Sequence, residues 1–68
     1  MNPSAKALAP SNATILVVDD EESIRFTFDT FISKAGYTVL SAGRLEIADR
    51  QMDLHNVYLI FCDILLPE

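Results

Sequence analysis

The sequence of 68 residues holds a single cysteine, half as many basic as acidic residues, and no long apolar run. One cysteine, Cys62, excludes an intrachain disulfide framework and a zinc site built from cysteines, and its apolar surroundings predict an inert core residue. The formal charge of −5 argues against nucleic-acid binding by this segment, because little in it would neutralise phosphates.

The apolar residues fall in short runs, and none approaches the ~18 residues of a membrane-spanning helix. The N-terminus also lacks the basic region and apolar core of a signal peptide. We therefore expect a cytoplasmic protein that does not contact a membrane. Residues 1–13 are small, polar and interrupted by two prolines, which predicts a flexible leader before one domain at residues 14–68.

From residue 14 onward, short apolar runs alternate with helical patterns. The patterns predict strands and helices, in chain order, at residues 14–18, 21–36, 37–42, 44–53 and 57–62. The first run, "TILVV", is continuously apolar and β-branched, which is typical of a strand buried on both faces. The order β-α-β-α-β predicts an α/β fold with a parallel sheet and crossover helices.

Each predicted helix shows an apolar stripe. The stripe of the first helix consists of Ile24, Phe28, Phe31, Ile32 and Ala35, and we interpret its middle part, Phe28, Phe31 and Ile32, as core. Lys34 in the last turn and Gly36 just beyond it favour a helix end there. The stripe of the second helix is weaker; it contains Leu45, Ala48 and Met52 and leaves Ile47 outside.

Acidic residues follow two of the three predicted strands. Asp19 and Asp20 come directly after the first strand, and Asp63 comes directly after the third. If the sheet is doubly wound, its strand order is 2-1-3, and the carboxyl ends of the first and third strands are neighbours at the switch point. The three carboxylates would then converge in one crevice.

Two interpretations of these acids remain open. Acids before a helix commonly cap it, and an aspartate after a strand is a common turn residue. Their combination instead favours a hard cation such as Mg²⁺, because clustered like charges need compensation and Arg25 is the only nearby basic residue in sequence. A carboxylate beside bound Mg²⁺ can also act as a nucleophile.

Three segments resemble the receiver domain of two-component response regulators: "ILVVDDEESIR", "GYTVLSA" and "CDILLP". The resemblance covers residues 14–67 and implies a flavodoxin-like doubly wound sheet, here truncated to β-α-β-α-β. The sequence also has some similarity to NtrC-like transcriptional regulators, although no residue in the chain requires a DNA-binding output domain.

The resemblance also implies roles for individual residues. Asp63 matches the phosphoacceptor and is also part of the metal site. Asp20 matches a direct Mg²⁺ ligand, and Asp19 matches an acid that acts through metal-bound water. The backbone carbonyl of Leu65 matches the main-chain ligand of the metal. A sensor histidine kinase would be the partner that supplies the phosphoryl group, and the chain would be a regulatory phosphoacceptor with at most self-catalysed phosphorylation and dephosphorylation, not an enzyme.

The chain departs from the family pattern in length. The receiver fold has further strands, and the hydroxyl residue and lysine that they carry are absent from this sequence. The outer edge of the third strand would therefore lie bare, which is a template for pairing with another chain. We hypothesise a homo-oligomer in which this edge completes the sheet.

Two other functions are possible for such a chain. One is a truncated structural or dimerising fragment without phosphotransfer. The other is a phosphatase with an aspartate nucleophile, which the sequence disfavours because such enzymes need a second acid where Leu65 stands.

Overall fold

The computed structural model describes residues 12–63 of the chain. Its five elements are β1 (Thr14–Val18), α2 (Glu22–Lys34), β2 (Thr38–Ala42), α3 (Leu45–Leu54) and β3 (Leu59–Cys62). All five elements predicted from the sequence are present. The predicted leader falls almost entirely outside the described residues. Neither described helix is long and apolar enough to cross a membrane.

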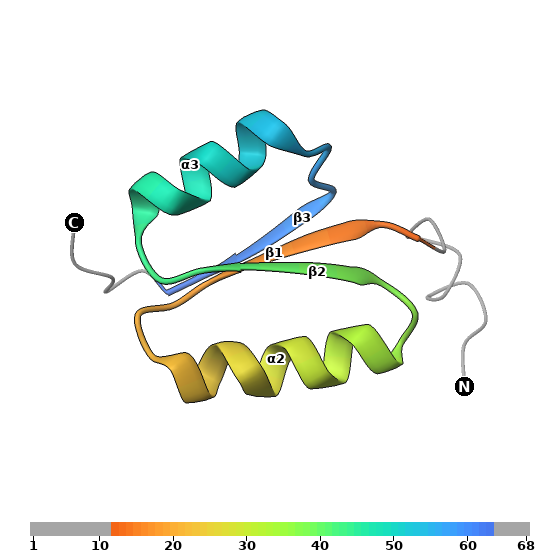
Figure 1. The fold of residues 1–68 in the computed structure, drawn as a ribbon. Coiled ribbons are helices and arrows are strands. Elements are labelled where there is room, and N and C mark those ends of the chain that lie inside the picture. The colour runs from red at the N-terminus through yellow and green to blue at the C-terminus, as the bar shows by residue number, and fades with distance from the viewer. Residues whose placement is uncertain (1–11, 64–68) are drawn as a thin grey trace.

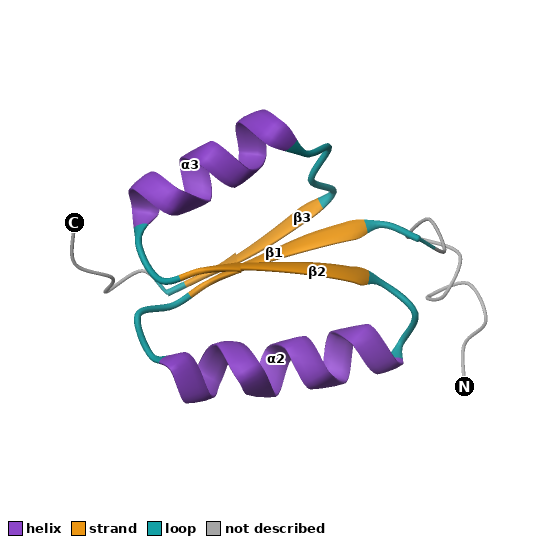
Figure 2. Ribbon diagram, in the orientation of Figure 1, coloured by secondary structure: helices purple, strands orange, loops and turns teal. Residues whose placement is uncertain are grey.

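The three strands form one parallel sheet in the order β2-β1-β3, as the sequence predicts for a doubly wound fold. Figure 1 shows α2 on one face of the sheet and α3 on the other, so the fold has three layers. The same layers are visible when the ribbon is coloured by structure type (Figure 2). The carboxyl ends of the strands all lie at one edge of the sheet because the strands are parallel.

β1 is the centre of the core, as its apolar run predicts. Leu16 and Val18 pack with Ala42 of β2 and Ala48 of α3, and Leu16 is 0% exposed. Partly buried side chains surround this cluster, among them Ile47. Ile47 therefore contacts the core although the predicted stripe of this helix left it outside. Leu45 and Met52 of that stripe are instead exposed, because α3 contacts the sheet through the middle of the helix.

The apolar stripe of α2 is less buried than the sequence predicts. Phe31 is 70% exposed and Phe28 is 41% exposed, so the interpretation of both as core was wrong. Phe28 stacks on Phe61 of β3, with 5.7 Å between ring centroids. Among the described residues β3 is the last strand on this side, and the sheet therefore covers the stripe only in part.

β3 is the least buried strand. Its four residues are all exposed, and within the described residues it pairs on one side only, with β1. Cys62 is among them, so the prediction of a core cysteine was wrong. This open edge agrees with the bare edge expected from the sequence.

The C-terminal end of α2 is fixed by Gly36, as its position predicts. Gly36 has a φ of 100°, and its N–H donates to the carbonyl of Ser33 at 3.0 Å. The N–H of Tyr37 donates to the carbonyl of Ile32 at 3.4 Å, which completes a Schellman motif. This tight turn directs the chain from α2 straight into β2.

We expect Gly36→Ala to lower the free energy of unfolding by about 1 kcal/mol, because a β-carbon is strained at positive φ. Gly36→Asn should cost less, since asparagine tolerates the left-handed region better than alanine. Urea unfolding followed by circular dichroism measures both. Equal stability of the glycine and alanine proteins would contradict the role of the turn.

Candidate functional site

The acidic residues after β1 and β3 are brought together by the register of the parallel strands. Val18 of β1 is aligned with Cys62 of β3, and the N–H of Asp63 donates to the carbonyl of Val18 at 3.0 Å. The ladder thus extends one residue past β3. Asp63 is therefore placed beside Asp19, which directly follows Val18.

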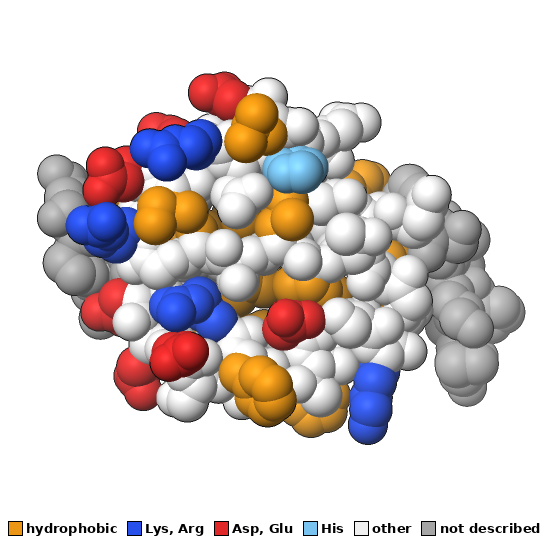
Figure 3. Space-filling model, viewed as in Figure 1, with side chains coloured by type: hydrophobic (Ala, Val, Ile, Leu, Met, Phe, Trp, Pro, Cys, Tyr) orange, Lys and Arg blue, Asp and Glu red, His pale blue; other side chains and the backbone are white. Residues whose placement is uncertain are grey.

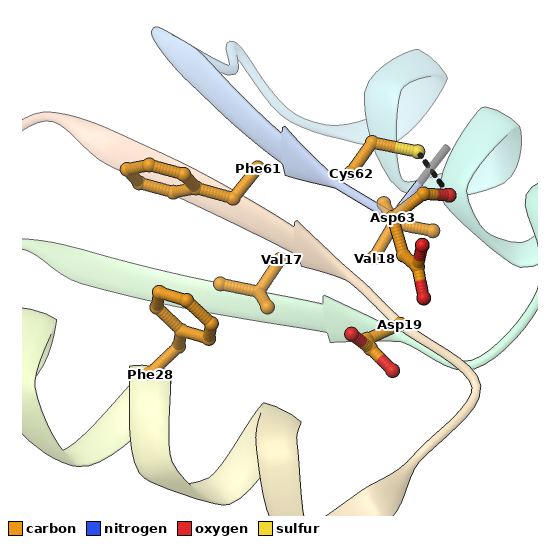
Figure 4. Close-up of a pocket in the computed structure, with 7 residues that line it drawn as sticks. All are labelled: Val17, Val18, Asp19, Phe28, Phe61, Cys62 and Asp63. Carbon is orange, nitrogen blue, oxygen red and sulfur yellow. Dashed lines mark hydrogen bonds between the residues drawn. The ribbon is translucent and has the colours of Figure 1, made fainter. Parts of the chain in front are cut away.

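Strand alternation sets the direction of both side chains. Residues two apart in a strand share a face, so Asp19 follows Val17 and Asp63 follows Phe61 on one face of the sheet. These side chains line an open hollow of about 270 Å³ beneath α2. Figure 4 shows the carboxylates of Asp19 and Asp63 at the strand ends, and the Cys62 sulfur beside the main-chain oxygen of Asp63 at 3.8 Å.

Asp20 completes the group. One carboxylate oxygen from each of Asp19, Asp20 and Asp63 lies within 4.8 Å of the other two. Asp19 and Asp63 are half-buried and Asp20 is exposed. The convergence predicted from the strand ends is therefore present, although Leu65, whose carbonyl was expected as a further ligand, lies outside the described residues.

The donor set fits a hard divalent cation. Mg²⁺ prefers oxygen ligands, is usually held by one or two carboxylates, and keeps several waters. Two half-buried carboxylates and an exposed third one provide such ligands at an edge open to solvent. The residues present therefore fit Mg²⁺.

The capping interpretation accounts for only part of this arrangement. The N-cap of α2 is Glu21, and no side-chain cap bond is formed there. The N–H of Glu21 donates to Oδ1 of Asp19 at 2.9 Å, a turn-type bond. This bond uses one oxygen of one aspartate and does not explain why Asp20 and Asp63 converge on the same point.

The groups that the basic side chains contact could not be predicted from their spacing in the sequence alone. The described ion pair, between Arg44 and Glu46 at 3.5 Å, is exposed at the start of α3. Arg25, the basic residue closest in sequence to the acids, donates from Nη1 to the main-chain oxygen of Asp19 at 2.6 Å. Figure 3 shows charged side chains gathered over the half of this view where the strands end.

The comparison with protein families identifies the family to which the chain belongs. The family model for the response regulator receiver domain matches residues 15–68. The chain belongs to this family.

Relatives with assigned names are similar to this chain. The alkaline phosphatase synthesis transcriptional regulatory protein PhoP of Bacillus subtilis is 39% identical over 84% of this chain and 24% of its own length. The probable transcriptional regulators ycf27 of Cyanophora paradoxa and Cyanidium caldarium are 41% and 35% identical, each over 79% of this chain. The chain spans about a quarter of the length of these relatives. No solved structure matches significantly.

The crowding of the carboxylates predicts a measurable repulsion between Asp20 and Asp63. In metal-free solution at low ionic strength, Asp20→Asn and Asp63→Asn should be coupled. Each single substitution removes the same repulsion, so the two gains in unfolding free energy should not add. The gain of the double variant should be about 0.5–1 kcal/mol smaller than the sum of the two single gains, which is the Coulomb energy expected at this separation.

A double-mutant cycle by urea unfolding measures the coupling, and high salt should remove most of it. Asp49→Asn, an exposed acid on α3, is the matched control and should not couple to Asp63→Asn. A coupling that is absent at low salt would contradict the described proximity.

Proposed function

We propose that the chain is the phosphoacceptor part of a two-component response regulator, and that Asp63 receives a phosphoryl group in a reaction that requires Mg²⁺. The observation that carries the proposal is the convergence of Asp19, Asp20 and Asp63 at the carboxyl edge of the sheet. Membership of the receiver family supports it. The cytoplasm is the compartment that we propose for this activity.

The donor that fits this chemistry is a phosphohistidine on a sensor histidine kinase. A carboxylate oxygen of Asp63 would attack the phosphorus, the new O–P bond would form as the P–N bond breaks, and the imidazole nitrogen would keep the electron pair. When bound, Mg²⁺ would neutralise charge on the phosphoryl oxygens during transfer. Asp20 would bind the metal directly, Asp19 through a water, and the carbonyl of Leu65 from the main chain.

The position of Asp63, next to β1 and open to solvent, suits it to the acceptor role. Its N–H is anchored to β1, and its carboxylate lines the open hollow beneath α2. A phosphoryl donor can therefore approach from solvent while the main chain of the acceptor is hydrogen-bonded to β1. The chain would act as a regulatory acceptor and not as an enzyme with a separate substrate, and its phosphorylated form would modulate an output domain or partner.

Incubation of the 68-residue chain with Mg²⁺ and acetyl phosphate tests the proposal. Intact mass spectrometry should show one acid-stable, base-labile phosphoryl adduct on the wild-type chain. Asp63→Asn should lose the adduct because the nucleophile is gone, and chelation of Mg²⁺ should prevent it. Asp49→Asn should keep the adduct. An unmodified wild-type chain would instead favour a structural or dimerising fragment.

We also propose that the chain forms a homo-oligomer through the outer edge of β3, with a second copy of β3 as the partner. The exposed residues Leu59, Ile60 and Phe61 support this proposal, since each is between 42% and 45% exposed. An apolar strand with one unpaired side is a template for a further strand. A two-fold pairing of identical edges would cover both copies at once.

Sedimentation velocity should show a dimer whose dissociation constant rises at least about tenfold in Ile60→Lys, because charge on an edge strand opposes pairing. Phe26→Lys is the matched control: Phe26 is also exposed, but it lies on α2. A stable, folded wild-type monomer would sink the oligomer without touching the phosphoacceptor proposal.

A further inference from the structure

Arg25 links α2 to the acidic site through the main chain. It lies in the first turns of α2 and is half-buried. Its Nη1 donates to the carbonyl oxygen of Asp19 at 2.6 Å, a short bond between a charged donor and the residue that directly follows β1. The guanidinium thereby ties the start of the helix to the turn that carries Asp19 and Asp20.

Gly43 makes room for this contact. A β-carbon at Gly43 would lie 3.0 Å from Nη1 and 3.5 Å from Cζ of Arg25. Gly43 directly follows β2, so the guanidinium lies against the main chain at the end of a second strand. Gly43 does not have a positive φ, so the close approach is the constraint that a β-carbon would meet here: the guanidinium would have to shift by a few tenths of an ångström.

The surroundings of Arg25 do not explain it as an ordinary ion pair. Glu22 and Asp29 lie one turn to either side and line the same shallow groove. Within residues 12–63, Arg25 forms no ion pair with either acid, and its hydrogen bond goes to the Asp19 carbonyl instead. The guanidinium therefore binds the main chain of the acidic site and not an acidic side chain.

Asp19 is held at three points as a result. Its N–H donates to the carbonyl of Ala42 at 3.1 Å, its carbonyl accepts from Arg25, and its Oδ1 accepts from the N–H of Glu21. These bonds fix the turn after β1 from the side of β2 and from the side of α2. The carboxylates of the turn lie close to that of Asp63, with one oxygen from each within 4.8 Å of the others.

We propose that Arg25 is a positioning residue for the acidic site: it holds the Asp19–Asp20 turn so that both carboxylates converge with Asp63, and it thereby strengthens Mg²⁺ binding. Gly43 contributes to the same arrangement, because it has no β-carbon that would displace the guanidinium from the Asp19 carbonyl. This inference rests on the proposed function and adds a residue that touches neither the metal nor the phosphoryl group.

The direction in which Mg²⁺ affinity changes when Arg25 is substituted distinguishes a positioning role from a simple electrostatic one. A positive charge near a cation site repels the bound metal, so its removal should tighten Mg²⁺ binding if charge alone mattered. Loss of a positioning residue should weaken binding instead. Substitution of Arg25 therefore moves the affinity in opposite directions under the two explanations.

Mg²⁺ titrations of the 68-residue chain, followed by amide NMR shifts, test the proposal. Arg25→Ala should weaken Mg²⁺ affinity about tenfold, the low end of the range for residues that orient metal ligands. Gly43→Ala should weaken it in the same direction while keeping the charge. Arg44→Ala, which removes an equally positive but exposed side chain, should leave the affinity unchanged.

Amide hydrogen exchange in metal-free protein gives a second readout. The Glu21 N–H, which donates to Asp19, should exchange faster in Arg25→Ala and Gly43→Ala than in the wild type or Arg44→Ala. Slow exchange at Leu16, which is 0% exposed, shows that each variant is folded.

Two results overturn the proposal, and they are distinguishable. A wild-type chain that binds no Mg²⁺ overturns both this inference and the proposed function. A wild-type chain that binds Mg²⁺, together with equal or tighter binding by the folded Arg25 and Gly43 variants, overturns the positioning role alone.

Discussion

The parallel pairing of β1 on both of its sides is the constraint on which the rest of the structure depends. β1 supplies the largest fully buried side chains and pairs with β2 on one side and β3 on the other. Parallel strands end at the same edge, so this pairing also decides where the acids meet. One strand therefore organises both the hydrophobic core and the candidate site.

Much of this arrangement was predictable because local and global signals agree. The run at Thr14–Val18 is short, β-branched and continuously apolar, which is typical of a buried strand. Gly36 could end α2 because glycine adopts positive φ without strain. Alternation of strands and helices then predicted a parallel sheet, and the switch point predicted the meeting of Asp19 with Asp63. The alternation needs only short-range pattern and the general rules of α/β folds, whereas the strand order was conditional on a doubly wound sheet, which the resemblance to receiver domains implies.

The remaining features depend on contacts that periodicity does not contain. An apolar stripe does not reveal how far the sheet extends beneath it, which is why Phe31 was predicted to be core and is exposed. The binding partner of Arg25 is a main-chain carbonyl, and no spacing of side chains in the sequence marks such a partner. The importance of Gly43 likewise becomes visible only when the guanidinium is seen beside it.

The site therefore joins two strands with unequal support. Asp19 follows the most buried strand and is tied down through its N–H, its carbonyl and its carboxylate, whereas Asp63 follows the most exposed one. The backbone of β3 is joined to β1 at both ends, by Tyr58 N–H to the Thr14 carbonyl at 2.8 Å and by Asp63 N–H to the Val18 carbonyl at 3.0 Å. Because a metal site needs its ligands at fixed separations, a contact that covers β3 would also stabilise the position of Asp63. A contact that buries the exposed residues of β3 would thus also help to hold the acceptor Asp63 in place.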